Sequence, residues 1–138
     1  MFQKFFGGFR EWSLLPLRFA LGWIFIAHGG QKLFGLWGGH GLQGFATMLE
    51  SMGLHPALPL AILSSGAEFF GGLMVLFGFY ARFGAFLIAV DMAVAVATVH
   101  APKGFFMQGG GYEYNVALIA ISLCILFAGS GRWSIKQG

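Results

Sequence analysis

Residues 57–79, ALPLAILSSGAEFFGGLMVLFGF, decide the fold because they are mostly apolar and carry a single charged side chain, Glu68, near the middle. A run of about 20 apolar residues is long enough to cross the hydrocarbon core of a bilayer as a helix. A charge at the bilayer centre costs about 2.5–3.5 kcal/mol on the insertion scale, so it usually faces a pocket, a partner or water. The stretch therefore predicts a membrane helix whose acidic residue acts between helices.

The composition of the whole chain points the same way. Of its 138 residues 57% are hydrophobic and only 9% are charged, whereas soluble domains carry about 25% charged residues. The net charge of +3 is scattered, without the basic cluster that nucleic-acid binding needs. The single cysteine, Cys124, excludes an intramolecular disulfide and a cysteine-rich metal cluster. Any redox chemistry would therefore need a bound cofactor.

Four apolar stretches predict an all-α fold, an integral membrane four-helix bundle in a single transmembrane domain, residues 1–138, with spans at about 14–36, 57–79, 83–100 and 112–130. The first span must include Arg18 or Lys32, which could snorkel to opposite interfaces because they lie about 21 Å apart along a helix. Small residues four apart predict a packing face on the third span: Ala85, Ala89, Ala93 and Ala97.

Two further segments are expected at the membrane surface. Residues 1–13 mix phenylalanines and a tryptophan with Lys4 and Arg10, which is typical of the headgroup zone. Residues 42–52 predict a short interfacial or amphipathic helix in the first extracytoplasmic loop. The positive-inside rule sets the topology, because five cations fall on the side of the termini and only Lys32 and Lys103 on the other. Both termini are therefore expected to be cytoplasmic.

This topology places one set of polar residues in the outer half of the bundle: His28, Lys32, Glu68, His100, Glu113 and Asn115. Lys32 could form a buried ion pair with Glu68 or with Glu113, either as a structural clamp between helices or as part of a polar pocket. In the second case an amphipathic ligand such as a quinone would fit. The expected catalytic, proton-exchanging residues are Glu68 and Glu113, and the expected ligand-binding residues are Arg18, His28, Lys32, His100 and Asn115.

Other polar residues have weaker patterns. His28 and His100 lie on different spans at similar depth, as two haem ligands would, but haem is not expected because the other histidines, His40 and His55, lie in a loop. A metal site is not expected because no close His/Glu spacing is present. Asp91 could face Arg18, Arg82 or a partner protein. Tyr114 and its neighbour Tyr112 are expected to be interfacial anchors.

Three stretches together resemble the DoxX family of small bacterial four-helix membrane proteins: GWIFIAHGGQKLFG (22–35), GAEFFGGLMVLFGFYAR (66–82) and GGGYEYNVALIAISLCILFAGSGRWSI (109–135). The resemblance places recurrent polar positions of the family at Arg18, Lys32, Glu68, Arg82 and Glu113. It implies a multi-pass protein of the bacterial inner membrane. The family takes its name from a subunit of a quinol oxidase or thiosulfate:quinone oxidoreductase, and many of its members have no assigned activity.

The residues and the resemblance together lead to one preferred hypothesis. The chain is expected to be a small subunit of a redox-linked, quinone-interacting membrane complex, in contact with lipid and with a membrane or peripheral redox protein, and able to form homo-oligomers. Whether it is itself an enzyme stays open, since electron transfer would need the redox centre of a partner. The alternatives are a non-catalytic scaffold or assembly protein and a small oligomeric transporter.

Overall fold

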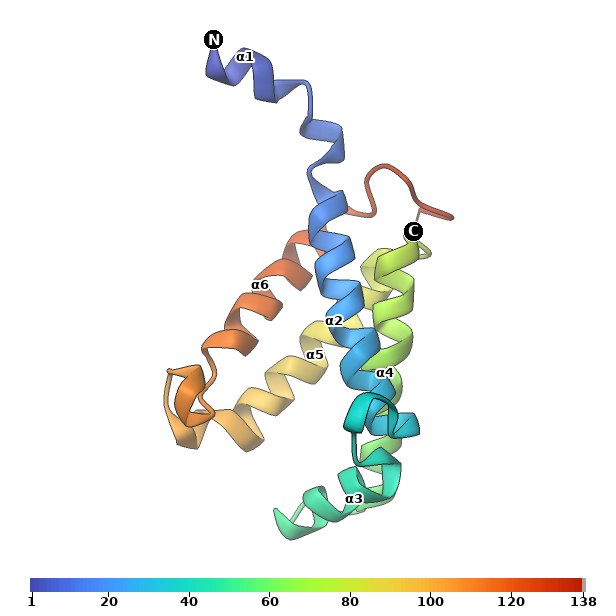
Figure 1. Cartoon of the computed structure of the whole chain (residues 1–138), viewed down its shortest axis with the longest axis vertical. Helices are drawn as coiled ribbons and strands as arrows, with labels where there is room; N and C mark the ends of the chain where they lie inside the picture. The colour runs from blue at the N-terminus through green and yellow to red at the C-terminus, as the bar shows by residue number, and fades with distance from the viewer. Residues whose placement is uncertain (138) are drawn as a thin grey trace.

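The computed structural model describes residues 1–137, which form helices joined by short turns (Figure 1). Six α-helices lie within this part of the chain: α1 (Phe2–Gly7), α2 (Leu14–Phe34), α3 (Gly41–Ser51), α4 (Ala57–Phe77), α5 (Ala81–Ala95) and α6 (Glu113–Ala128). A π-helical turn, Val96–His100, extends α5. The predicted all-α fold is confirmed, and a long helix coincides with each of the four expected spans.

The four long helices pack in the order α2, α4, α5 and α6. α2 lies along α4, α4 along α5 and α5 along α6, around a core that includes Leu21, Phe25, Val75, Ile88 and Ile125. The contact between α6 and α2 is smaller, and Figure 1 shows α6 leaning away from α2 towards its first residue. The helices therefore diverge at the end of the molecule that carries α3 and the loop before α6.

Two glycines allow α2 and α4 to approach at backbone distance. A Cβ atom added to Gly22 would lie 2.9 Å from the Gly72 carbonyl oxygen, and one added to Gly72 would lie 2.8 Å from the Gly22 carbonyl oxygen. Membrane helices associate closely through small residues of this kind, because lipid tails provide no hydrophobic force between helices. This contact sets the crossing of α2 over α4.

The predicted alanine face of α5 is wrong in its outer half. Ala85 is buried, but Ala93 and Ala97 are exposed, and the residues that pack inward are Ala81, Ala85, Ile88 and Met92. At 3.6 residues per turn, positions four apart rotate by about 40° per step, so a strict four-residue spacing leaves the packing face after a few steps. Alternating steps of four, three and four residues stay on it.

The short helix predicted in the first loop is confirmed as α3. It buries Phe45, Ala46 and Leu49 against Ala61, which lies in the first half of α4. Gly53 follows the helix with a φ of +76°, a backbone conformation that glycine adopts without strain. α3 therefore covers one end of α4 beside the point where α2 ends.

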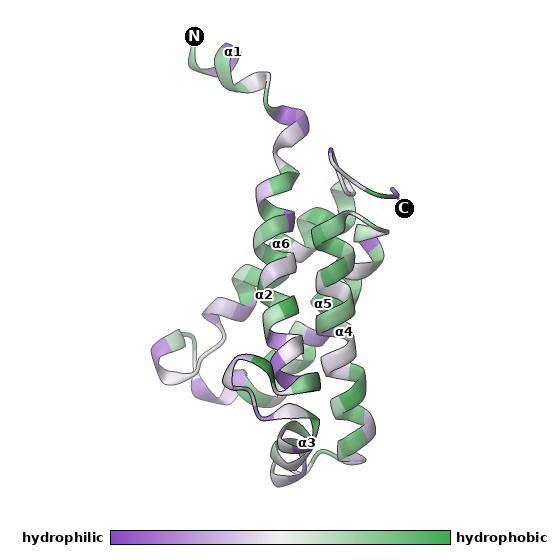
Figure 2. Cartoon of the chain, turned by 45° about the vertical axis from the view of Figure 1, so that its right-hand side comes forward, coloured by the Kyte–Doolittle hydropathy of each residue, from purple (hydrophilic) through white to green (hydrophobic). Residues whose placement is uncertain are grey.

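The surface of the helices is strongly apolar. α4 and the helical run Ala81–Lys103 are each long and apolar enough to cross a membrane, and α6 is a shorter apolar helix. Large apolar side chains point outward along these helices, among them Leu63, Phe70, Phe83 and Phe127. Figure 2 shows the same distribution, with hydrophobic residues along the helices and hydrophilic ones mostly near the ends and in the loops. The two chain ends lie at the same end of the bundle, with α1 projecting beyond it (Figure 1).

Candidate functional site

An ion pair between α2 and α4 is the centre of the candidate site. Lys32, in the last turn of α2, places its Nζ 2.8 Å from Oε1 of Glu68, in the middle of α4. The side chain of Glu68 is 2% exposed and that of Lys32 is 29% exposed. Nζ of Lys32 also lies 4.6 Å from the centre of the Phe45 ring, a cation–π contact to α3. The sequence left two possible partners for Lys32, Glu68 and Glu113, and in the structure Lys32 pairs with Glu68.

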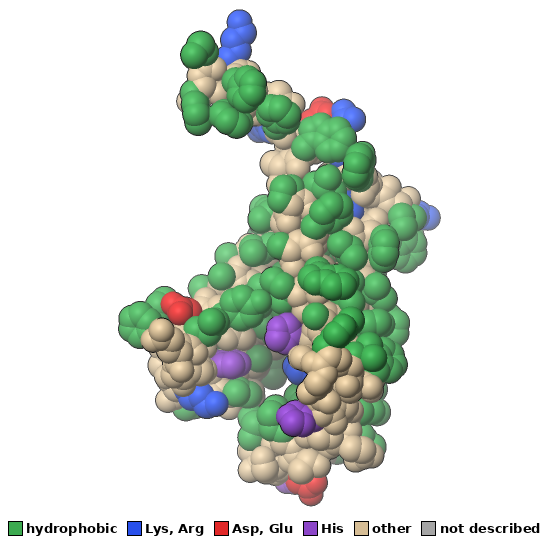
Figure 3. Space-filling view, in the orientation of Figure 1, with side chains coloured by type: hydrophobic (Ala, Val, Ile, Leu, Met, Phe, Trp, Pro, Cys, Tyr) green, Lys and Arg blue, Asp and Glu red, His purple; other side chains and the backbone are tan. Residues whose placement is uncertain are grey.

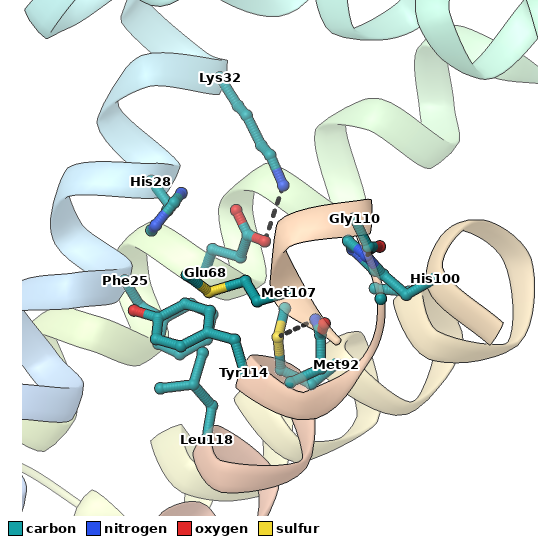
Figure 4. A pocket seen from close by; sticks show the side chains of 13 residues that line it. Phe25, His28, Lys32, Glu68, Met92, His100, Met107, Gly110, Tyr114 and Leu118 are labelled. Atoms are coloured by element: carbon teal, nitrogen blue, oxygen red, sulfur yellow. Dashed lines mark hydrogen bonds and ion pairs between the residues drawn. The ribbon is translucent and has the colours of Figure 1, made fainter. Parts of the chain in front are cut away.

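The ion pair lines one end of a cavity of about 210 Å³ between the four long helices (Figure 4). Phe25, Met92 and Leu118 form its apolar wall. The cavity lies where α6 diverges from α2, and Figure 3 shows histidine side chains around a hollow on this face of the molecule. An apolar wall with a few convergent polar groups is the usual composition of a small-molecule site.

Three further predicted site residues, His28, His100 and Asn115, also line the cavity. His100 is held in place by its Nδ1, which lies 2.7 Å from the carbonyl oxygen of Gly110. Asn115 is buried, and its side-chain amide donates to Sδ of Met92 at 3.5 Å, a weak acceptor. The amide of Asn115 and the ring of His28 are therefore placed to exchange hydrogen bonds with a molecule in the cavity.

Arg18 was expected in the ligand site, but it lies at the opposite end of α2, buried and outside this cavity. Its side chain donates five hydrogen bonds of 2.7–3.1 Å to backbone carbonyl oxygens, those of Val75, Leu76, Ser130, Arg132 and Trp133. A guanidinium has five N–H groups, so all of its donors are used. Two of the acceptors belong to the last turn of α4, where the helix dipole favours a cation. Arg18 therefore joins α2, α4 and the C-terminal residues.

Glu113 also lies outside the cavity lining. Its Oε1 accepts a hydrogen bond of 3.0 Å from the backbone N–H of Met107, and its own backbone N–H donates to the carbonyl oxygen of Phe105. The carboxylate is in the first turn of α6, where the helix dipole favours a negative charge. In this position Glu113 ties the loop before α6 to the start of that helix.

Asp91 faces neither of the arginines that the sequence suggested. Its Oδ1 accepts a hydrogen bond of 2.5 Å from the hydroxyl of Ser64 on α4. Arg18 uses all its donors on carbonyl groups, and Arg82 is nine residues away, about 13 Å along the helix. Ser64 and Glu68 are four residues apart, so both polar side chains lie on one face of α4. This polar face is the sequence signal that could have suggested a polar partner such as Asp91.

Tyr114 and Met107 also line the cavity, and neither was predicted as a site residue. Tyr114 was expected to be a membrane-interface anchor, which the pattern of aromatic residues before α6 favoured. Met107 lies in the loop that folds back towards the bundle, next to the Glu113 contact. Neither has a sequence pattern that distinguishes a cavity residue from a surface one.

The comparisons with known proteins identify a family for the chain. Residues 13–101 match the model of the DoxX family. A Haemophilus influenzae protein is 28% identical over 136 residues, which cover 94% of this chain and 92% of the relative. A second protein of that organism is 28% identical over 127 residues, 89% of this chain and 80% of the relative. Both are described only as "Uncharacterized protein".

A third relative carries a description. A Bacillus subtilis protein, "Putative oxidoreductase CatD", is 31% identical over 115 residues, covering 83% of this chain and 79% of the relative. No solved structure shows significant similarity to the chain. Since the family model extends over more than half of the sequence, and a relative above 30% identity covers most of it, the chain belongs to the DoxX family of membrane proteins.

Proposed function

We propose that the chain crosses the bacterial inner membrane four times, through α2, α4, α5 and α6, with both termini in the cytoplasm. The location of both chain ends at one end of the bundle suits an even number of crossings (Figure 1). The segments at that end carry most of the cations: Lys4, Arg10, Arg82, Arg132 and Lys136. In a variant without Cys124, we expect a cysteine at position 103 to react with an impermeant maleimide added to intact spheroplasts, and one at position 136 to react only after lysis. The reverse result would invert the topology.

We further propose that the cavity binds the ring of a quinone or of a similar lipid-soluble molecule. The observation that carries this proposal is the Lys32–Glu68 pair at one end of an otherwise apolar cavity. A volume of about 210 Å³ is below the roughly 300–1,000 Å³ of most ligand pockets, so it accommodates a single ring and leaves a hydrocarbon tail among the helices. The ring oxygens of a quinone are hydrogen-bond acceptors, and the donors around the cavity match them.

The residues of the cavity have distinct roles in this proposal. Lys32 and His28 orient the ligand by donating to a ring oxygen, and the amide of Asn115 donates from α6. Glu68 exchanges a proton with the bound ring, since its carboxyl group is buried at the end of the cavity. Phe25 and Leu118 contact the ring faces. When bound, a quinone supplies reversible electron and proton uptake, and the electrons come from the redox centre of a partner protein.

The description of a relative as an oxidoreductase supports a redox role, because that relative covers most of the chain. We accordingly propose that the protein is a small subunit of a redox-linked membrane assembly. Function is carried by sites rather than by folds, so the cavity residues decide the proposal and the family only supports it.

Substitution of Lys32 by glutamine tests ligand binding. A hydrogen bond from a charged donor contributes about 1.5–3 kcal/mol, so we expect a short-chain quinone to bind about 10- to 100-fold more weakly to the variant. The measurement is a titration in detergent, followed by quenching of tryptophan fluorescence. Lys103→Gln is the matched control, because Lys103 is an exposed cation at the same end of the molecule. Equal affinities for the two variants would contradict the proposal.

A scaffold role is the second candidate, favoured by the way Lys32 joins three helices through Glu68 and Phe45. If this were the only role, Lys32→Gln would lower the yield of folded protein, but the molecules that fold would retain full activity in their host pathway. The two functions therefore differ in whether a folded variant has a specific defect.

A further inference from the structure

One buried oxygen of Glu68 takes no part in the ion pair with Lys32. Oε1 binds Lys32, whereas Oε2 is buried and has no hydrogen-bond donor from the described residues. Asp91 of α5 accepts from the hydroxyl of Ser64 at 2.5 Å, which fixes its carboxyl group against α4. Ser64 and Glu68 are four residues apart and therefore lie on one face of α4. Carboxyl groups from two adjacent helices thus lie beside each other behind the cavity.

Two ionised carboxylates cannot satisfy each other, because both are hydrogen-bond acceptors only. A single proton between them changes this, since the protonated group donates to the other oxygen and removes the repulsion of two like charges. Two aspartates share a proton in this way in the aspartic proteases.

The charges around the pair favour the same state. Lys32 of α2 provides one positive charge, and the neighbouring titratable group of that helix is His28. On α4 a further polar group, the hydroxyl of Ser64, donates a hydrogen bond to Asp91. With one shared proton, Lys32, Glu68 and Asp91 together carry no net charge. Neutrality is the favourable state for a cluster surrounded by apolar side chains.

We propose that Glu68 and Asp91 form a carboxyl pair that shares one proton, and that Asp91 is a proton-holding residue for the cavity although it does not line it. Towards the ligand, this rests on the proposed function. The proton leaves a Glu68 oxygen for an anionic ring oxygen of the ligand, so one O–H bond breaks and another forms without electron transfer. Lys32 stabilises the carboxylate left on Glu68, and water returns a proton to the pair.

Infrared spectroscopy of the ligand-free protein in lipid tests the pair. At neutral pH we expect a carbonyl band of a protonated carboxyl group that shifts in deuterium oxide. In Asp91→Asn the amide donates to Oε2 of Glu68, so the carboxylate no longer needs a proton and the band is lost. Glu68→Gln removes the band by the same reasoning, through donation to Asp91. Glu113→Gln and Glu50→Gln are controls that keep it.

The outcomes separate this proposal from the function of the cavity. Absence of the band in the unmodified protein, or its persistence in Asp91→Asn, overturns the shared proton. Circular dichroism checks that each variant is folded, and if Asp91→Asn does not fold, the Glu68→Gln spectrum decides. Quinone binding is measured separately, so a failure of binding with an intact band refutes the ligand and leaves the pair. Loss of the band in both variants with the controls unchanged supports the proposal.

Discussion

Replacement of Arg18 by methionine is expected to lower the stability of the folded protein more than the loss of any other single charge. Methionine matches the length of the buried stem, but it removes the guanidinium donors from five carbonyl oxygens. Removal of one partner from a buried charged contact typically costs about 3–5 kcal/mol. We expect a loss of this size in the free energy of unfolding, measured by titration with sodium dodecyl sulfate in mixed micelles.

Arg82→Met is the matched control for this experiment. Arg82 is an exposed arginine whose hydrogen bond to the Phe127 carbonyl oxygen is long, at 3.5 Å, so its loss should change stability by less than about 1 kcal/mol. Arg18→Lys should resemble Arg18→Met, because an ammonium has three donors and no planar arrangement to reach five acceptors. Unfolding of Arg18→Met and Arg82→Met at the same detergent fraction would disprove the structural role of Arg18.

Filling the cavity should abolish ligand binding while the fold is retained. Ala95 lines the cavity from the last turn of α5, and a phenylalanine there would place a ring in the space of about 210 Å³ that the ligand needs. We expect a short-chain quinone to bind at least 100-fold more weakly to Ala95→Phe. Thermal stability should stay the same or rise, because a filled cavity gains van der Waals contacts.

Ala93→Phe provides the comparison on the same helix. Ala93 is exposed, so the added ring points away from the bundle and should leave binding unchanged. If both Ala95→Phe and Ala93→Phe bind the quinone as tightly as the unmodified protein does, the ligand does not bind in this cavity.

The helices could be predicted from the sequence because apolar runs and their lengths mark them directly. The second span was expected at 57–79 and α4 is Ala57–Phe77, and the amphipathic stretch in the first loop forms α3. The end of the third span was less regular than expected, since α5 stops at Ala95 and a π-helical turn carries the chain to His100. Local hydrogen-bond patterns of this kind depend on packing that apolar periodicity does not encode.

The members of the candidate site could be predicted only where polar side chains lie close to other polar side chains. Six residues were grouped by their depth in the bundle. The structure places five of them around one cavity, namely His28, Lys32, Glu68, His100 and Asn115, and leaves Glu113 outside it. Arg18 could not be placed, because its partners are backbone carbonyl groups, which every residue has. Asp91 lacked an obvious partner because its hydrogen-bond donor is a serine, and a search for opposite charges does not find a serine.

The carbonyl groups that surround Arg18 also make the last residues of the chain a condition for completing the fold. Arg18 leaves the ribosome early, whereas three of its five acceptors, at positions 130, 132 and 133, are synthesised more than a hundred residues later. A premature stop codon just after α6 would leave all six α-helices in place but remove three of the five acceptors of the buried guanidinium, which would keep only the carbonyl oxygens of Val75 and Leu76. Loss of this short C-terminal segment would then destabilise the whole bundle, and quality-control proteases that act on less stable proteins would remove the unfinished copies.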